Sequence, residues 1–348
     1  MSPLRRTLER LLERRDLTEA EARALLAELT QPELAPALAG AVLVALRVKG
    51  VVAEEVRGFA TEMRRLARRP RIPPATRAID IVGTGGDGSG SLNISTGTAL
   101  LTAACGLAVV KHGNRSISSR AGSADVLEAL GVPMPLDEQA AAECLAAVRF
   151  TFLFAPYYHP AMKALASVRS ALGVRTVFNL LGPLTNPAEP ALHVIGAPGL
   201  EEARLIAATL AGMPLERAFV VHGAEGWDEP TPVGPFTLFD VRNGRVSVEV
   251  RAPADYGLAS CASARLKGGD AHHNARALTA VLTGADRGPH RDCLTLGAAL
   301  ALEVAGEASS PREAIARAGE AIDSGAAGRV LKSLAAFAAA RGAGSGGP

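Results

Sequence analysis

Residues 80–91 read DIVGTGGDGSGS, a short apolar strand that runs directly into a glycine loop. The polar residues 93–96 (NIST) follow and open an apolar helix, so the local order is strand, loop, helix. A glycine loop joined to a helix N-terminus presents free backbone N–H groups, which form a natural anion site. This stretch therefore predicts an α/β domain with an anion site at one edge of its sheet.

The next predicted strand, Leu107–Lys111, brings cations to the same edge of the sheet. It ends in Lys111, His112 and Arg115, and it continues into a serine-rich turn before the helix that opens at Gly122-Ser123. Each serine alone is as readily a turn former or a helix cap, but together they favour a second phosphate-binding turn. One strand end that supplies N–H groups and one that supplies cations suit a multiply phosphorylated ligand.

The glycine loop has two other interpretations, a dinucleotide site and a flexible loop without a ligand. Gly83, Gly85 and Gly88 satisfy GxGxxG, but a dinucleotide site needs an acidic residue at the end of the next strand. That strand ends in basic residues, which argues against a dinucleotide. A flexible loop without a ligand is the other alternative, and the capping residues 93–96 argue against it.

The pattern of the whole chain predicts two unequal domains. Residues 4–69 are helical in pattern, with Asp16 or Thr18 as one helix cap, and the proline-rich segment 69–74 follows as a linker. Strands then alternate with helices, which predicts a mostly parallel central sheet flanked by helices. The expected units are a helical domain at 1–72, joined by helices from about 165–190, an α/β domain at 73–340 and a disordered tail at 341–348. The other expected strands are 78–82, 150–154, 192–195 and 218–222, with a hairpin at 236–250 turned at Asn243-Gly244 and a last helix at 311–340.

Composition narrows the function classes. Lys plus Arg is 37 against 35 for Asp plus Glu, a net charge of +2, so no nucleic-acid or acidic-membrane surface is expected. The apolar run 37–46 is about half of a membrane span, and the charged N-terminus is unlike a signal peptide. The four cysteines are scattered among apolar residues, which favours buried, reduced thiols over a disulfide or zinc site. A cytoplasmic protein is expected.

An acidic pair, Asp228-Glu229, follows the apolar strand 218–222 after a short glycine loop. Adjacent carboxylates at the ligand-bearing edge of a sheet suit Mg²⁺, which prefers oxygen ligands and keeps several waters. A solvated acidic pair is the alternative, and the phosphate loop opposite favours the metal. Asp87, inside the glycine loop, binds the ligand either through its turn or through a metal.

Long motifs resemble one family, anthranilate phosphoribosyltransferase. They run in order over almost the whole chain, so chance does not explain the match. The similar segments are Lys49-Gly50, 80–87 with 93–96, 111–119, 122–131 (GSADVLEALG), 154–156 with 159–162, 175–187 (RTVFNLLGPLTNP), 221–223 with 228–229, and 268–270 with 274–275.

The resemblance implies a homodimer that transfers phosphoribose from 5-phosphoribosyl-1-pyrophosphate (PRPP) to anthranilate with Mg²⁺, with two ions per monomer, in tryptophan biosynthesis. Ser95, Asp228 and Glu229 would bind magnesium, and Gly83, Asn114, His159 and Arg169 would meet anthranilate. Arg169, His112, Asp228 and Glu229 would form the catalytic set. PRPP would be held by Gly83, Gly86, Asp87, Ser91, Asn93, Ile94, Ser95, Thr96, Lys111, His112, Gly113, Asn114, Arg115, Ser116, Ile117, Ser118, Ser119 and Ser123.

The chemistry of anthranilate assigns further roles. Its amine is scarcely basic and already has a lone pair, so no strong general base is needed. Its carboxylate suits a planar guanidinium, and Arg169 is the candidate, with a surface arginine as the alternative. His112 and His159 either shape the aromatic pocket, accept a proton late or are simply packed histidines, and neither is assigned as a base.

Some positions depart from the family pattern, namely Tyr157-Tyr158, Trp227, Pro230 and His272-His273. None removes a proposed ligand, and the two adjacent histidines lack further ligands for a metal. A pyrimidine nucleoside phosphorylase would be longer and would lack KHGNR followed by GSADVLEALG. A catalytically silent relative would be expected to lose Asp228-Glu229, Arg169 or the Lys111-His112 pair.

Overall fold

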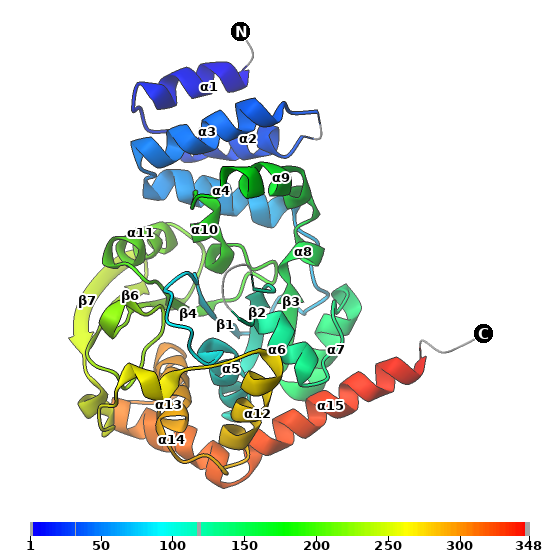
Figure 1. The fold of residues 1–348 in the computed structure, drawn as a ribbon, viewed down its shortest axis with the longest axis vertical. Helices are drawn as coiled ribbons and strands as arrows, with labels where there is room; N and C mark the ends of the chain where they lie inside the picture. The colour runs from blue at the N-terminus through cyan, green and yellow to red at the C-terminus, as the bar shows by residue number, and fades with distance from the viewer. Residues whose placement is uncertain (1–2, 32, 117–119, 345–348) are drawn as a thin grey trace.

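The protein has a small helical domain stacked on a larger α/β domain (Figure 1). The coordinates are a computed structural model that describes residues 3–31, 33–116 and 120–344. Two helices from the middle of the chain, α9 (Lys163–Leu172) and α10 (Phe178–Leu181), pack against the N-terminal helices α3 and α4 respectively. The N-terminal helices are α1 (Pro3–Leu12), α2 (Glu19–Leu29), α3 (Pro36–Lys49) and α4 (Ala53–Leu66).

The α/β domain is built on one seven-stranded sheet with the order β3-β2-β1-β4-β5-β6-β7. The first five strands in the chain are parallel, and β6 and β7 form an antiparallel hairpin at one edge. The predicted fold class is confirmed. The strands are β1 (Ala78–Gly83), β2 (Ala108–Gly113), β3 (Phe150–Phe154), β4 (Leu192–Gly196), β5 (Arg217–His222), β6 (Phe236–Arg242) and β7 (Arg245–Arg251).

Helices cover both faces of this sheet, as the continuous burial of its parallel strands requires. In β4, Val194 belongs to the core shared with the C-terminal helices, whereas Ile195 belongs to the core shared with α11 and the helical domain. The remaining helices are α5 (Ile94–Ala104), α6 (Ser123–Ala129), α7 (Glu138–Val148), α8 (Ala155–Tyr158), α11 (Leu200–Ala211), α12 (Ala271–Leu282), α13 (Pro289–Val304), α14 (Pro311–Asp323) and α15 (Ala326–Gly344), with short 3₁₀ turns at Pro160–Met162, Gly182–Leu184, Ala224–Gly226, Pro253–Tyr256 and Ser263–Leu266.

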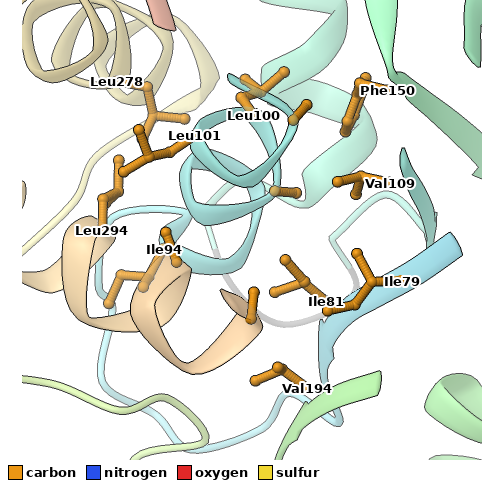
Figure 2. Packing of buried hydrophobic residues seen from close by; sticks show 14 of the residues in the cluster. Ile79, Ile81, Ile94, Leu100, Leu101, Val109, Phe150, Val194, Leu278 and Leu294 are labelled. Carbon is orange, nitrogen blue, oxygen red and sulfur yellow. The ribbon is translucent and has the colours of Figure 1, made fainter. Parts of the chain in front are cut away.

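Helix α5, which follows the glycine loop, is fixed on two sides. Figure 2 shows Leu278 and Leu294 against Leu101, while Leu100 lies toward Phe150 and the sheet. Gly97 brings the helix close to its neighbours, because a Cβ there would lie 2.5 Å from a methyl carbon of Leu294. The residues at the start of α5 are therefore held in place by core packing.

Several local predictions can be compared with the structure. Thr18, rather than Asp16, caps α2 in a capping box with Glu21, whereas Asp16 pairs with the buried Lys49 at 2.6 Å. The hairpin turns at Asn243-Gly244 as predicted, with φ values of 52° and 71° that suit the twist of the strands.

Two predictions about the C-terminus are wrong. The helix expected at 311–340 is broken between α14 and α15, where Gly325 adopts a φ of 75°. Helix α15 continues to Gly344, so the first part of the predicted disordered tail, 341–344, is helical, and 345–348 lie outside the described residues. Arg341 holds this end through an ion pair with Glu143 at 2.7 Å.

The cysteine prediction is confirmed for bonding and in part for burial. Cys105, Cys144, Cys261 and Cys293 are free, but only Cys144 and Cys293 are buried, while the other two are half-buried. In the part of the chain that the structure describes, no helix is both long enough and apolar enough to cross a membrane.

We expect folding stability to fall as the pH drops below about 6.5, partly through His193 of β4. Burial lowers the pKa of this imidazole to about 3, whereas in the unfolded chain it titrates near 6.5. The unfolded state therefore binds an extra proton between these pH values, which costs about 1.4 kcal/mol per pH unit. Urea unfolding of the wild type and His193→Leu from pH 7 to pH 5 measures this. An equal pH dependence in both would contradict the assignment.

Candidate active site

The glycine loop crosses from β1 to α5 at the carboxyl edge of the sheet. Four of its residues, Gly85, Gly86, Gly88 and Gly90, have φ values between 59° and 81°, a region that side chains other than glycine rarely adopt. The loop is fixed at its start by Thr84, whose amide donates to the Gly196 carbonyl at 3.0 Å, and farther on by Lys267, whose Nζ donates to the Ser89 carbonyl.

The tip of this loop carries unused backbone donors. Among residues 3–31, 33–116 and 120–344, the amides of Gly86, Asp87, Gly88 and Gly90 have no hydrogen-bond acceptor. The three glycines are also exposed. A turn of successive free N–H groups is an anion-binding concavity, so the structure supports the anion site predicted from the sequence.

The acidic pair lies directly beside the loop. Asp228 accepts a hydrogen bond from the Gly85 amide at 2.6 Å, and Glu229 accepts one from the Ser95 amide at 3.0 Å. The three residues predicted to bind magnesium, Ser95, Asp228 and Glu229, are thus brought together from α5 and the segment after β5. The predicted PRPP residues Ile94 and Thr96 are buried beside Ser95 in the same first turn of α5.

Glycines at the strand ends let the acidic pair approach the sheet, a close contact that the sequence motifs did not predict. A Cβ at Gly83 would lie 2.3 Å from Asp228 Oδ2, and one at Gly196 would lie 1.6 Å from the Asp228 carbonyl oxygen. Trp227, noted above only as a departure from the family pattern, is buried in the core and anchors the chain just before the pair. The sequence signal for this close approach is that two strands that are neighbours in the sheet, β1 and β4, each end in a glycine.

Burial and nearby negative charge destabilise the ionised forms of Asp228 and Glu229. Burial, and then the negative charge of Asp87, raises the pKa of Asp228 to about 7. Burial and the charge of Asp228 raise the pKa of Glu229 well above its ordinary range. A divalent cation would relieve this repulsion, which is an independent reason to expect one.

The donor set fits magnesium. Within the described ranges, no three His, Cys, Asp or Glu side chains form a metal site by themselves. Mg²⁺ does not need such a cage, because it binds through one or two carboxylates and completes its shell with waters and substrate phosphates. Asp228, Glu229 and the Ser95 hydroxyl match that requirement.

Lys111 lies beneath the site, with its ammonium turned inward. Its Nζ donates to the Ile81 carbonyl at 2.5 Å and to Ser95 Oγ at 3.1 Å, and the side chain is buried. The ammonium therefore balances the negative charge around Ser95. On the neighbouring strand β1, Asp80 is buried and accepts hydrogen bonds from the His112 amide at 3.2 Å and from Asn186 at 2.8 Å.

The segment after β2 is held in place by side chains of helix α6, which follows it in the chain. The Arg115 guanidinium pairs with Asp125 at 3.1 Å and with Glu128, both on α6. Ser123 Oγ donates to the Asn114 carbonyl at 3.2 Å, and a Cβ at Gly113 would lie 2.4 Å from that hydroxyl. The Ser116 amide donates to Asp125, and the predicted ligands Ile117, Ser118 and Ser119 lie outside the described residues.

The other side of the loop is tied to the C-terminal half of the chain. Ser91 pairs with Lys267 in a short antiparallel bridge. Asn93 donates to the Ala121 carbonyl at 3.0 Å and accepts a hydrogen bond from Asn274 at 2.7 Å. At the start of α12, Asp270 caps the amide of His273 at 2.8 Å. The His272-His273 pair therefore opens a helix.

His112 and His159 pack against each other, and Arg169 of α9 contacts a different ring. The rings of His112 and His159 lie 5.1 Å apart, edge to face, and burial lowers their pKa values to about 3 and about 4. Imidazoles with pKa values this low are weak bases, which agrees with assigning neither as a base. Arg169 lies over the Phe178 ring at 5.2 Å and has no carboxylate partner in the described chain. No hydrogen bond among those residues joins it to Gly83, Asn114 or His159.

Comparison with known proteins identifies the family. Residues 5–67 match the helical bundle domain of a glycosyl transferase family, and 75–328 match its a/b domain. The chain is 48% identical over 336 residues to the anthranilate phosphoribosyltransferase of Solibacter usitatus, covering 96% of this chain and 98% of that protein.

Solved structures agree. The anthranilate phosphoribosyltransferase of Thermus thermophilus superposes with a TM-score of 0.90 at 40% identity, covering 95% of this chain and 99% of that one. The enzyme from Saccharomyces cerevisiae, in complex with PRPP and Mg, superposes with a TM-score of 0.89 at 27% identity, covering 97% and 98%. The chain therefore belongs to the anthranilate phosphoribosyltransferase family.

Proposed function

We propose that the protein transfers the 5-phosphoribosyl group of PRPP to the amine of anthranilate, in a Mg²⁺-dependent reaction of tryptophan biosynthesis. The products are N-(5-phosphoribosyl)anthranilate and pyrophosphate. The observation that carries the proposal is the set of free amides at Gly86, Asp87, Gly88 and Gly90, beside Asp228 and Glu229. Relatives named for this activity cover nearly the whole chain.

The charge that develops in this reaction matches the site. Departure of pyrophosphate from C1 leaves positive charge on the ribose ring and adds negative charge to the leaving group. The loop amides bind and orient the pyrophosphate, and such fixed donors stabilise the charge that builds there. Asp228, Glu229 and Ser95 would hold Mg²⁺, proposed as two ions per monomer. When bound, the metal supplies further neutralisation of the negative charge on the leaving group. The other PRPP ligands are proposed from the 91–96 and 111–123 segments, as predicted above.

Anthranilate is assigned to the side of the site near the two histidines. Arg169 lacks an anionic partner among the described residues, and burial lowers its pKa, so a substrate carboxylate would be favoured beside it. The neutral rings of His112 and His159 offer an aromatic wall, and Gly83 and Asn114 complete the proposed contacts. The amine attacks with its own lone pair, so these residues position the substrate without acting as strong bases.

We further propose a cytoplasmic homodimer that assembles through the helical domain, with the boundary between domains at residues 72 and 73. On α1 and α3, the apolar side chains of Leu12 and Val48 are 63% and 66% exposed. They border a shallow groove of about 330 Å³ lined mostly by Leu, Val and Ala. An exposed apolar groove of this kind is typical of an interface between subunits.

The test is a fluorescence assay of anthranilate consumption by the purified protein. We expect consumption only when PRPP and Mg²⁺ are both present, and we expect EDTA to stop it. Omission of PRPP controls for non-specific quenching, and circular dichroism confirms folding. No consumption by the folded protein would contradict the proposed function.

A further inference from the structure

The two cations predicted to bind PRPP already have partners within the chain. Lys111 donates to the Ile81 carbonyl and Ser95, and Arg115 is held by Asp125 and Glu128. Lys267 also lies at the glycine loop, but its Nζ donates to the Ser89 carbonyl and so supports the loop backbone. The pyrophosphate of PRPP carries dense negative charge, and a cation facing the loop tip would complement the free amides there.

Arg175 supplies a cation in that position. It lies in the connection between α9 and α10, and its guanidinium packs directly on the loop, because a Cβ at Gly86 would lie 2.5 Å from Arg175 Nη1. Gly86 belongs to the row of loop residues with free amides. Arg175 therefore presents its donors at the tip of the proposed anion site.

The Arg175 guanidinium has only a weak ion-pair partner within the chain. It pairs with Glu202 of α11, where Nη2 lies 3.3 Å from Oε1 and 3.4 Å from Oε2. Both side chains are about one-third exposed, at 39% and 33%, and exposed pairs of this kind contribute little. Glu202 can therefore be exchanged for a stronger anion at small cost.

The backbone at this position is held by two hydrogen bonds. Arg47 of α3 donates from Nη1 to the Arg175 carbonyl, and the Thr176 amide donates to Asn179 Oδ1 at 2.9 Å. The arginine thus projects from a fixed point, with only its side chain free to exchange partners. Such preorganisation lowers the entropy cost of binding.

We propose that Arg175 binds the pyrophosphate group of PRPP, and also binds free pyrophosphate as the product, by exchanging its ion pair with Glu202 for contacts with phosphate oxygens. This inference rests on the proposed function and adds a substrate-binding residue to it. A guanidinium offers two parallel donors to a phosphate, which an ammonium cannot reproduce. Glu202 acts as a competing anion that occupies the guanidinium when the site holds no phosphate.

The first experiment compares wild type, Arg175→Ala and Arg175→Lys in steady-state kinetics with inhibition by added pyrophosphate. We expect Arg175→Ala to raise the KM for PRPP and the inhibition constant of pyrophosphate by about tenfold or more, because one charged hydrogen-bonding group is lost. The KM for anthranilate should change much less, and the lysine variant should be intermediate. A folded Arg175→Ala with unchanged values for PRPP and pyrophosphate would overturn the proposal.

The second experiment removes the competing anion instead. Glu202→Gln should tighten pyrophosphate inhibition by up to about fivefold, the scale of an exposed ion pair. Glu201→Gln is the matched control, because Glu201 lies on the same helix and pairs with Arg204 at 3.8 Å. If Arg175→Ala fails to fold, identical inhibition of Glu202→Gln and wild type overturns the proposal. A wild type without PRPP-dependent activity would instead refute the proposed function itself.

Discussion

We expect turnover to fall by at least about 10³-fold when Asp228→Asn and Glu229→Gln are combined, while anthranilate binding survives. Asp228 is buried and Glu229 is half-buried beside the glycine loop, where they accept hydrogen bonds from the amides of Gly85 and Ser95 respectively. The amides that replace them have nearly the same shape but carry no charge to hold a cation. Loss of several kcal/mol of charge stabilisation in the transition state corresponds to this factor.

The measurement is anthranilate consumption over a series of Mg²⁺ concentrations, with binding of anthranilate followed by its fluorescence. The control is the chain's other Asp-Glu pair, Asp137→Asn with Glu138→Gln. Asp137 caps α7 by accepting the Ala140 amide at 2.7 Å, and asparagine caps equally well. We expect the control to keep its activity within about twofold. An unchanged magnesium dependence in the Asp228/Glu229 variant would refute the metal assignment.

The sequence was sufficient where the signal is local. The strand, glycine loop and helix at 80–96 are adjacent in the chain, and parallel strands place their carboxyl ends at one edge, so the pairing of this loop with Asp228-Glu229 followed. The break between α14 and α15 was missed because alanine-rich periodicity continues on both sides of Gly325. Glycine at that point was the only signal, and a single glycine is tolerated in many helices.

The sequence did not predict contacts in which a side chain binds a partner that is distant in the chain. Lys111 and Arg115 lie in a strongly basic motif, yet one ammonium points to the Ile81 carbonyl and the guanidinium pairs with α6. Arg175 resembles any loop arginine until folding brings Gly86 against it from 89 residues away in the sequence. Partner choice of this kind depends on tertiary packing, which periodicity and motifs do not report.

Gly196→Ala should reduce turnover by about 100-fold or more and lower the free energy of unfolding. A Cβ at this position would lie 1.6 Å from the Asp228 carbonyl oxygen and 2.5 Å from its carbon. These are backbone atoms, so relief requires moving the whole Asp228 segment or the end of β4. A displacement of about 1 Å of a catalytic group costs roughly 100-fold in rate, and forced overpacking costs about 1–3 kcal/mol.

Gly199→Ala is the matched control for this substitution, because a Cβ there would lie 3.7 Å from the nearest side-chain atom, in ordinary contact with Glu202. Urea unfolding and kcat, measured for both variants, separate the two effects. If the added methyl acts by displacing Asp228, Gly196→Ala loses more activity than its stability loss explains, and its magnesium requirement rises. Wild-type kcat and stability in Gly196→Ala would show that Asp228 is not held against β4 as the structure places it, and would remove the steric basis for the acidic pair's position.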